Sequence, residues 1–116
     1  MVIVKESEQL NEMSFSTVNG LKDSLPFDVV IHSPDHNPPH AHLYPVGVRQ
    51  ENKQLGQFLI PGRPPKFPGD VQDYKEGISD EQRSLLAPWM NQRNKEFPKL
   101  TNWELLNIQF KFALNQ

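Results

Sequence analysis

The eleven prolines of this 116-residue chain restrict where helices can form. Most of them cluster in two stretches, 34–45 and 61–68. Proline fixes φ, lacks a backbone N–H and pushes the residue before it away from the helical conformation. We therefore expect both stretches to be rigid, ordered loops or connectors, and we expect helices only outside them.

Composition narrows the class of protein further. A chain of this length fits one domain. It has no cysteine, which excludes disulfides and cysteine-based zinc sites and makes the cytoplasm the expected location. The net charge of −2 argues against a protein that wraps DNA or RNA, because phosphate binding depends on clustered Lys and Arg. We find neither a signal peptide nor an apolar run long enough for a membrane span.

Alternating apolar residues predict strands in the first half of the chain. Residues 27–32 alternate, and the chain re-enters a strand at His40 after the loop 33–39. Residues 46–50 and 54–60 are interpreted as a further hairpin with its turn at 51–53. Residues 1–26 are interpreted as an N-terminal extension or an edge strand, with short strands at 2–4 and 13–18 and a turn at Asn19-Gly20. Residues 27–116 then form a single α+β domain.

Two capping boxes predict helices in the second half. One is Ser79 to Gln82, and the other is Thr101 to Glu104. Pro88 is expected to break, kink or restart the first helix. The second helix has a broad apolar face, which either packs as core or serves in part as a dimer or partner surface. The predicted fold is α+β, a small antiparallel β-meander of three to four strands packed on one face by two C-terminal helices.

The main chemical signal is a cluster of histidines. All four lie within eleven residues, at His32, His36, His40 and His42. Side chains two apart on a strand point to the same face, so His40, His42 and Tyr44 are expected to share one face. Ala41 and Leu43 would then point into the core. His36 and the neighbouring Asp35 lie on the loop that the prolines stiffen.

Three functions would use such a cluster. A divalent metal such as zinc, nickel or iron would take His36, His40 and His42 as ligands and leave one position open. A metal-free pair of histidines would serve as general acid and base, and a pH-sensitive recognition patch is the third function. The structural alternative is that the histidines only hydrogen-bond a tight loop, with Asp35 capping backbone amides. The residues expected to support the site are His32, Asp35, Asn37, Pro38, Pro39 and Tyr44.

The stretch Asp35-His36-Asn37-Pro38-Pro39-His40-Ala41-His42 resembles the hallmark of the bacterial domain-of-unknown-function 4160 family. That hallmark has the form Asp-His-x-Pro-Pro-His-Phe-His followed by Tyr-Gly, and Asn102-Trp103-Glu104 is similar to its later Asn-Trp-Glu. The resemblance covers roughly residues 27–106. This chain has Ala41 in place of the aromatic residue, and Tyr44 comes one residue early. The alternation also resembles that of histidine-triad hydrolases, but Tyr44 stands where they need a third histidine.

The resemblance implies no established activity. Members of the family look like small proteins of two-gene modules, reminiscent of toxin–antitoxin pairs, which is an analogy and not a mechanism. We therefore expect a binding or regulatory module that acts through a protein partner or as a homodimer. The alternative is a small metal-dependent hydrolase or nuclease that uses His36, His40 and His42, with Asp35 or His32 as proton acceptor. Whether the chain is an enzyme stays open at this point.

Overall fold

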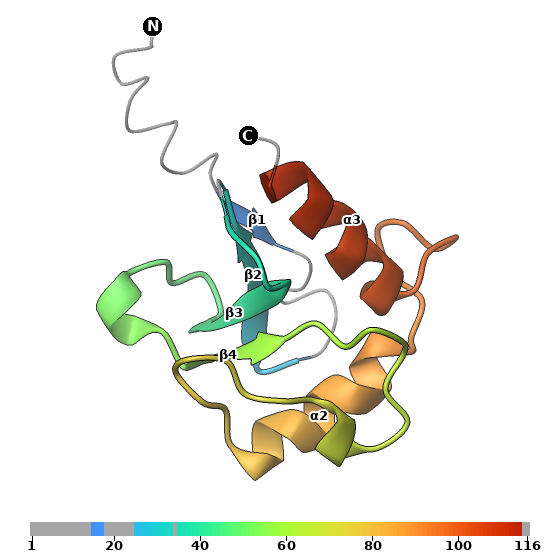
Figure 1. The fold of residues 1–116 in the computed structure, drawn as a ribbon, viewed down its shortest axis with the longest axis horizontal. Helices are drawn as coiled ribbons and strands as arrows, with labels where there is room; N and C mark the ends of the chain where they lie inside the picture. The colour runs from blue at the N-terminus through green and yellow to red at the C-terminus, as the bar shows by residue number, and fades with distance from the viewer. Residues whose placement is uncertain (1–14, 18–24, 34, 115–116) are drawn as a thin grey trace, which may run out of the picture.

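A four-stranded antiparallel sheet forms one half of the fold in the computed structural model (Figure 1). The structure describes residues 15–17, 25–33 and 35–114. The strands follow one another in chain order: β1 (Phe15–Thr17), β2 (Phe27–His32), β3 (His40–Pro45) and β4 (Gly56–Leu59). Val29 of β2 pairs with Leu43 of β3, and His40 of β3 pairs with Leu59 of β4. The predicted meander is therefore confirmed.

Two C-terminal helices, α2 (Asp80–Met90) and α3 (Asn102–Leu114), pack on this sheet. In Figure 1, α3 lies beside the β1–β2 side of the sheet and α2 crosses below β4. Two 3-10 turns lie between the elements, η2 (Glu51–Lys53) after β3 and η3 (Pro68–Asp70) after β4. The predicted α+β class is confirmed. In the described part of the chain, neither helix is long and apolar enough to cross a membrane.

The core forms between the helices and one face of the sheet. Ala41 and Leu43 point into it, as the alternation of β3 predicts. The other members come from β2, β4, the connector and both helices: Leu25, Phe27, Val29, Ile31, Phe58, Ile60, Val71, Ile78, Leu86, Ala87, Trp89, Met90, Leu105, Leu106, Phe110 and Ala113. The side chains of His40, His42 and Tyr44 therefore project from the opposite face of β3, and they are buried too.

Both capping boxes are present. The Ser79 hydroxyl accepts from the amide of Gln82, and the Gln82 side chain accepts from the amide of Ser79. Thr101 and Glu104 make the same pair of bonds at the start of α3. Helix α2 continues for two residues past Pro88 and ends at Met90, so the proline does not stop the helix at once. A proline so close to the C-terminus removes a single helical hydrogen bond.

The predicted strand over residues 46–50 is wrong. The chain leaves β3 at Pro45 and turns, with Gly47 at a φ of 79° and the amide of Val48 donating to the carbonyl of Pro45. The Asp28 carboxylate accepts from the amide of Gly47 and pairs with Arg49 at 2.9 Å. These side-chain bonds hold residues 46–50 as a loop, so β4 pairs directly with β3.

An irregular segment covers the outer edge of β4. The amide of Gln57 donates to Glu76, the amide of Leu59 donates to Gln72, and the amide of Tyr74 donates to Gln57. The two backbones come so close that a Cβ on Gly56 would lie 2.5 Å from the carbonyl oxygen of Gly77. Only glycine fits there, and the segment brings two further side chains, those of Tyr74 and Glu76, toward the histidines.

The N-terminal predictions are only partly within the described residues. The backbone of Phe15–Thr17 forms the edge strand β1, which lies inside the predicted strand 13–18. The predicted strand at 2–4 and the turn at Asn19-Gly20 lie outside the described residues.

Candidate metal centre

Asp35 is the centre of the histidine cluster. It follows β2 on the loop to β3, and its amide donates to the carbonyl of Ala113, which ties the loop to the end of α3. Although the loop is exposed around it, the Asp35 side chain is almost completely buried. One carboxylate oxygen, Oδ1, accepts from the amide of His36. The other, Oδ2, is buried and has no hydrogen-bond partner among the described residues.

His40, the first residue of β3, aims a ring nitrogen at this carboxylate. Its Nδ1–H donates to the carbonyl of Pro38 at 2.7 Å. In the neutral ring the Nε2 atom therefore carries the lone pair, and it lies 3.3 Å from Oδ1 of Asp35. Two acceptors that face each other attract only with a proton or a cation between them. A histidine that donates its other N–H to a carbonyl is also the arrangement typical of metal ligands.

His42 repeats this arrangement on the other oxygen of Asp35. Its Nδ1–H donates to the Gln54 side-chain oxygen at 2.6 Å, and the Gln54 amide nitrogen donates to Glu76. Its Nε2 lies 3.9 Å from Oδ2 of Asp35 and has no hydrogen-bond partner among the described residues. Burial lowers the pKa of His42, so the ring is neutral at pH 7 and Nε2 is an acceptor. Two unsatisfied buried acceptors thus face each other.

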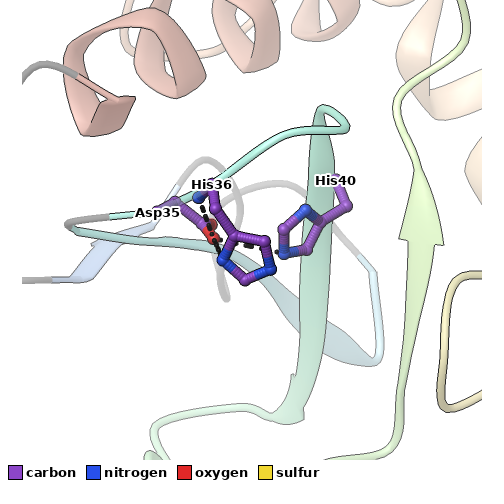
Figure 2. A group of neighbouring side chains, drawn as sticks. All are labelled: Asp35, His36 and His40. Atoms are coloured by element: carbon purple, nitrogen blue, oxygen red, sulfur yellow. Dashed lines mark hydrogen bonds and ion pairs between the residues drawn. The ribbon is translucent and has the colours of Figure 1, made fainter.

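His36 approaches the carboxylate from the solvent side. Its Nδ1 lies 3.5 Å from Oδ1 of Asp35, and 64% of its side chain is exposed. Figure 2 shows the side chains of His36 and His40 both joined to the Asp35 carboxylate by dashed lines. One ligand atom each from Asp35, His36 and His40 can be chosen so that all lie within 4.8 Å of one another. This Asp/His/His group could hold a metal ion.

The distances suit a four-coordinate ion. Zinc binds imidazole nitrogen and carboxylate oxygen at about 2.0–2.2 Å, which places tetrahedral ligand atoms roughly 3.3–3.6 Å apart. The contacts of Asp35 with His40 and His36, at 3.3 and 3.5 Å, match this spacing. The contact with His42 is slightly longer, at 3.9 Å. Of the predicted ligands His36, His40 and His42, the first two lie in this group together with Asp35, and His42 lies beside it.

His32 and Tyr44 pack behind His42 and away from the carboxylate. The rings of His32 and His42 are stacked, with centroids 3.7 Å apart, and Nε2 of His32 lies 2.9 Å from the Tyr44 hydroxyl. Burial, with smaller effects from His42, His40 and Arg49, lowers the pKa of His32 to about 3. The ring of His32 is thus neutral, and burial raises the pKa of the Tyr44 hydroxyl to which its Nε2 is hydrogen-bonded. Both residues position the ring of His42.

The prolines support the site through their backbone. The Asn37–Pro38 peptide bond is cis, and the carbonyl of Pro38 is the acceptor for His40. The carbonyl of Pro39 accepts from the amide of Ile60, which joins the loop to the end of β4. Asn37 is exposed. The predicted supporting residues therefore lie close together, but only some of them contact a histidine ring directly.

Sequence reasoning missed four neighbours of the histidines. Gln54 and Glu76 orient His42, while the rings of Tyr74 and Phe110 lie 4.4 and 5.8 Å from that of His40. Gln54, Tyr74 and Glu76 lie in irregular segments, so no periodic pattern marks them. Phe110 was predicted only as part of the apolar face of the last helix.

No protein-family model matches this chain, and neither a curated protein nor a solved structure matches it. The resemblance to the domain-of-unknown-function 4160 family stays a prediction from its short motif.

Proposed function

We propose that this chain is a divalent-metal-binding protein whose ligands are Asp35, His36 and His40, with His42 as the adjacent imidazole. The observation that carries the proposal is the convergence of two imidazole nitrogens on one carboxylate oxygen: Nε2 of His40 lies 3.3 Å and Nδ1 of His36 lies 3.5 Å from Oδ1 of Asp35. Beside these atoms, Oδ2 of Asp35 and Nε2 of His42 are buried without a hydrogen bond, which costs about 1–3 kcal/mol for each atom, and the positive charge of a nearby ion would offset part of this cost.

Zinc is the metal that we favour. Imidazole and carboxylate ligands at tetrahedral spacing suit it, and nickel and iron(II) accept the same ligands in other geometries. Magnesium and calcium prefer six or more oxygen ligands, which this group does not offer. The Nδ1–H bonds of His40 and His42 hold both rings in the tautomer that presents Nε2, as they are held in known metal sites.

The exposure of His36 points to the activity that such a site would support. An ion beside this side chain would face solvent on one side, and three protein ligands would leave a position free. A divalent ion held there would supply Lewis-acid activation of water, which is the chemistry of small hydrolases. Asp35 would offset half of the charge of the ion, and the stacked pair of His32 and His42 would keep one wall of the site dry.

Asp35→Asn is expected to weaken zinc binding by more than about 100-fold, since loss of an outer-shell partner alone costs about 10–100-fold. The substitution keeps the shape of the side chain but removes its charge. Calorimetric titration of the metal-free protein with zinc measures the effect. Asp80→Asn is the matched control, because it changes the same charge at a fully exposed position. Equal zinc affinity in the Asp35 and Asp80 variants would contradict the proposal.

A partner-binding role is a second candidate, and the last helix favours it. Ile108, Phe112 and Leu114 expose apolar surface on α3, although other members of its apolar face are buried in the core. We propose that this surface contacts a second copy of the chain or the protein partner of a toxin–antitoxin-like pair in the cytoplasm. Light scattering that finds only monomers would remove the homodimeric form of this candidate.

A further inference from the structure

The proline-rich connector after β4 lines an open cavity of about 570 Å³ that contains none of the proposed metal ligands. Its wall runs from Leu59 to Gln72 and includes Arg63, Lys66 and Phe67. Sites for small molecules commonly have volumes of about 300–1,000 Å³. We propose that this cavity binds a phosphate monoester that carries a flat ring, a ligand of the mononucleotide class.

The connector is held in place by the rest of the protein. Trp103 donates its indole N–H to the carbonyl of Pro61, and Asn91 donates to the carbonyl of Pro65. The Asp70 carboxylate accepts from the amides of Lys66 and Phe67. A wall that is ordered before the ligand arrives loses little conformational entropy on binding. The cavity is therefore suited to bind a small rigid ligand.

Two cations supply the attraction for a phosphate. Arg63 and Lys66 are exposed at the cavity, and neither forms a salt bridge in the described part of the chain. Both lie close enough to Asp70 to add to the lowering of its pKa, which the amides of Lys66 and Phe67 mainly cause. Asp70 is thus ionised, and the three groups leave one net positive charge. A guanidinium binds phosphate oxygens in pairs, while an ammonium adds a point charge.

An exposed aromatic ring supplies the contact for the flat part of the ligand. The Phe67 side chain lines the cavity, and 67% of the residue is exposed. Bases stack on aromatic side chains in proteins that bind single-stranded nucleic acids, whatever the base. Pro64 and Pro65 add apolar wall between the two cations. A phosphate next to a flat ring would therefore contact both the cations and Phe67.

A single mononucleotide fits these charges better than a strand of nucleic acid. Strand binding neutralises many phosphates along a basic track, whereas this cavity has two cations in a chain of net charge −2. The cavity also begins beside the candidate metal centre, because Leu59 pairs with His40 in the sheet. The proposed ligand site nevertheless consists of connector residues only and does not require a bound metal.

The test is a calorimetric titration of the full chain with adenosine monophosphate in the presence of EDTA, which removes metal from the outcome. We expect binding that is at least tenfold tighter than that of inorganic phosphate or adenosine alone. Arg63→Gln with Lys66→Gln should weaken it at least tenfold, and Phe67→Leu should weaken it severalfold. The control variant, Lys95→Gln with Lys99→Gln, changes the charge by the same amount outside the cavity. It should leave the affinity for adenosine monophosphate unchanged.

Three outcomes would overturn the proposal. The first is no heat of binding with adenosine monophosphate up to millimolar concentration. The second is equal weakening in the control variant, which would reveal a nonspecific charge effect. The third is inorganic phosphate that binds as tightly as adenosine monophosphate, which would remove the role of the ring. Since Arg63, Lys66 and Phe67 are exposed, thermal unfolding of each variant should match that of the parent protein.

Discussion

Zinc at a free concentration 1,000 times its dissociation constant is expected to stabilise the folded protein by about 4.1 kcal/mol. The physical reason is linkage: folding brings Asp35, His36 and His40 together, so zinc binds the folded state in preference to the unfolded one. For a chain of this size, such a gain raises the midpoint of thermal unfolding by more than about 10 °C. Thermal unfolding followed by circular dichroism, with and without zinc, measures the shift.

Two controls separate specific binding from a general effect of cations. Magnesium at the same concentration should leave the midpoint unchanged, because it demands oxygen ligands in an octahedral arrangement. The Asp35→Asn variant should lose most of the zinc-dependent shift, and EDTA should reverse the shift in the parent protein. A midpoint that zinc does not move, or moves equally in the variant, would leave the histidines with a structural role.

Phe58→Ala is expected to lower the free energy of unfolding by about 3–5 kcal/mol, the range for removal of a fully buried aromatic side chain. Phe58 lies in the middle of β4, has no exposed surface and belongs to the core between the sheet and the helices. Its backbone also pairs with Ala41 on one side and Asp73 on the other. The cavity left by the substitution would therefore open at the point where three segments meet.

Urea denaturation of the two variants Phe58→Ala and Phe97→Ala measures this effect against a matched control. Half of Phe97 is exposed, so its substitution should cost about 1 kcal/mol or less. The dependence of the free energy on urea should be the same in both variants and the parent protein. If the two substitutions, at Phe58 and at Phe97, lower the free energy of unfolding by similar amounts, β4 does not contribute to the core as described.

Local patterns predicted the regular elements of the fold. The alternation of residues 27–32 and the sequence after His40 correspond to β2 and β3, and the two capping boxes mark the starts of α2 and α3. The same period of two correctly placed Ala41 and Leu43 in the core. The loop at 46–50 could not be predicted in this way, because Asp28 holds it from a strand 19 residues earlier.

The site was predictable only in part for the same reason. Period two placed His40 and His42 on one face, but Asp35 reaches them through a loop that its amide ties to the end of α3. Asp35 therefore became the centre of the group, although the sequence predicted it as a turn cap, a supporting residue or a proton acceptor and not as a metal ligand. Gln54 and Glu76, which orient His42, come from segments with no periodic signal.

The most direct test of the account is to observe the ring nitrogens of the histidines by NMR while zinc is added to the ¹⁵N-labelled protein. We expect a coordination shift at Nε2 of His40 and Nδ1 of His36. Nδ1 of His40 should stay protonated and hydrogen-bonded to the carbonyl of Pro38. His32, whose Nε2 is bonded to Tyr44, should show no coordination shift. Unchanged ring nitrogens in His36 and His40 at saturating zinc would contradict the proposed metal centre.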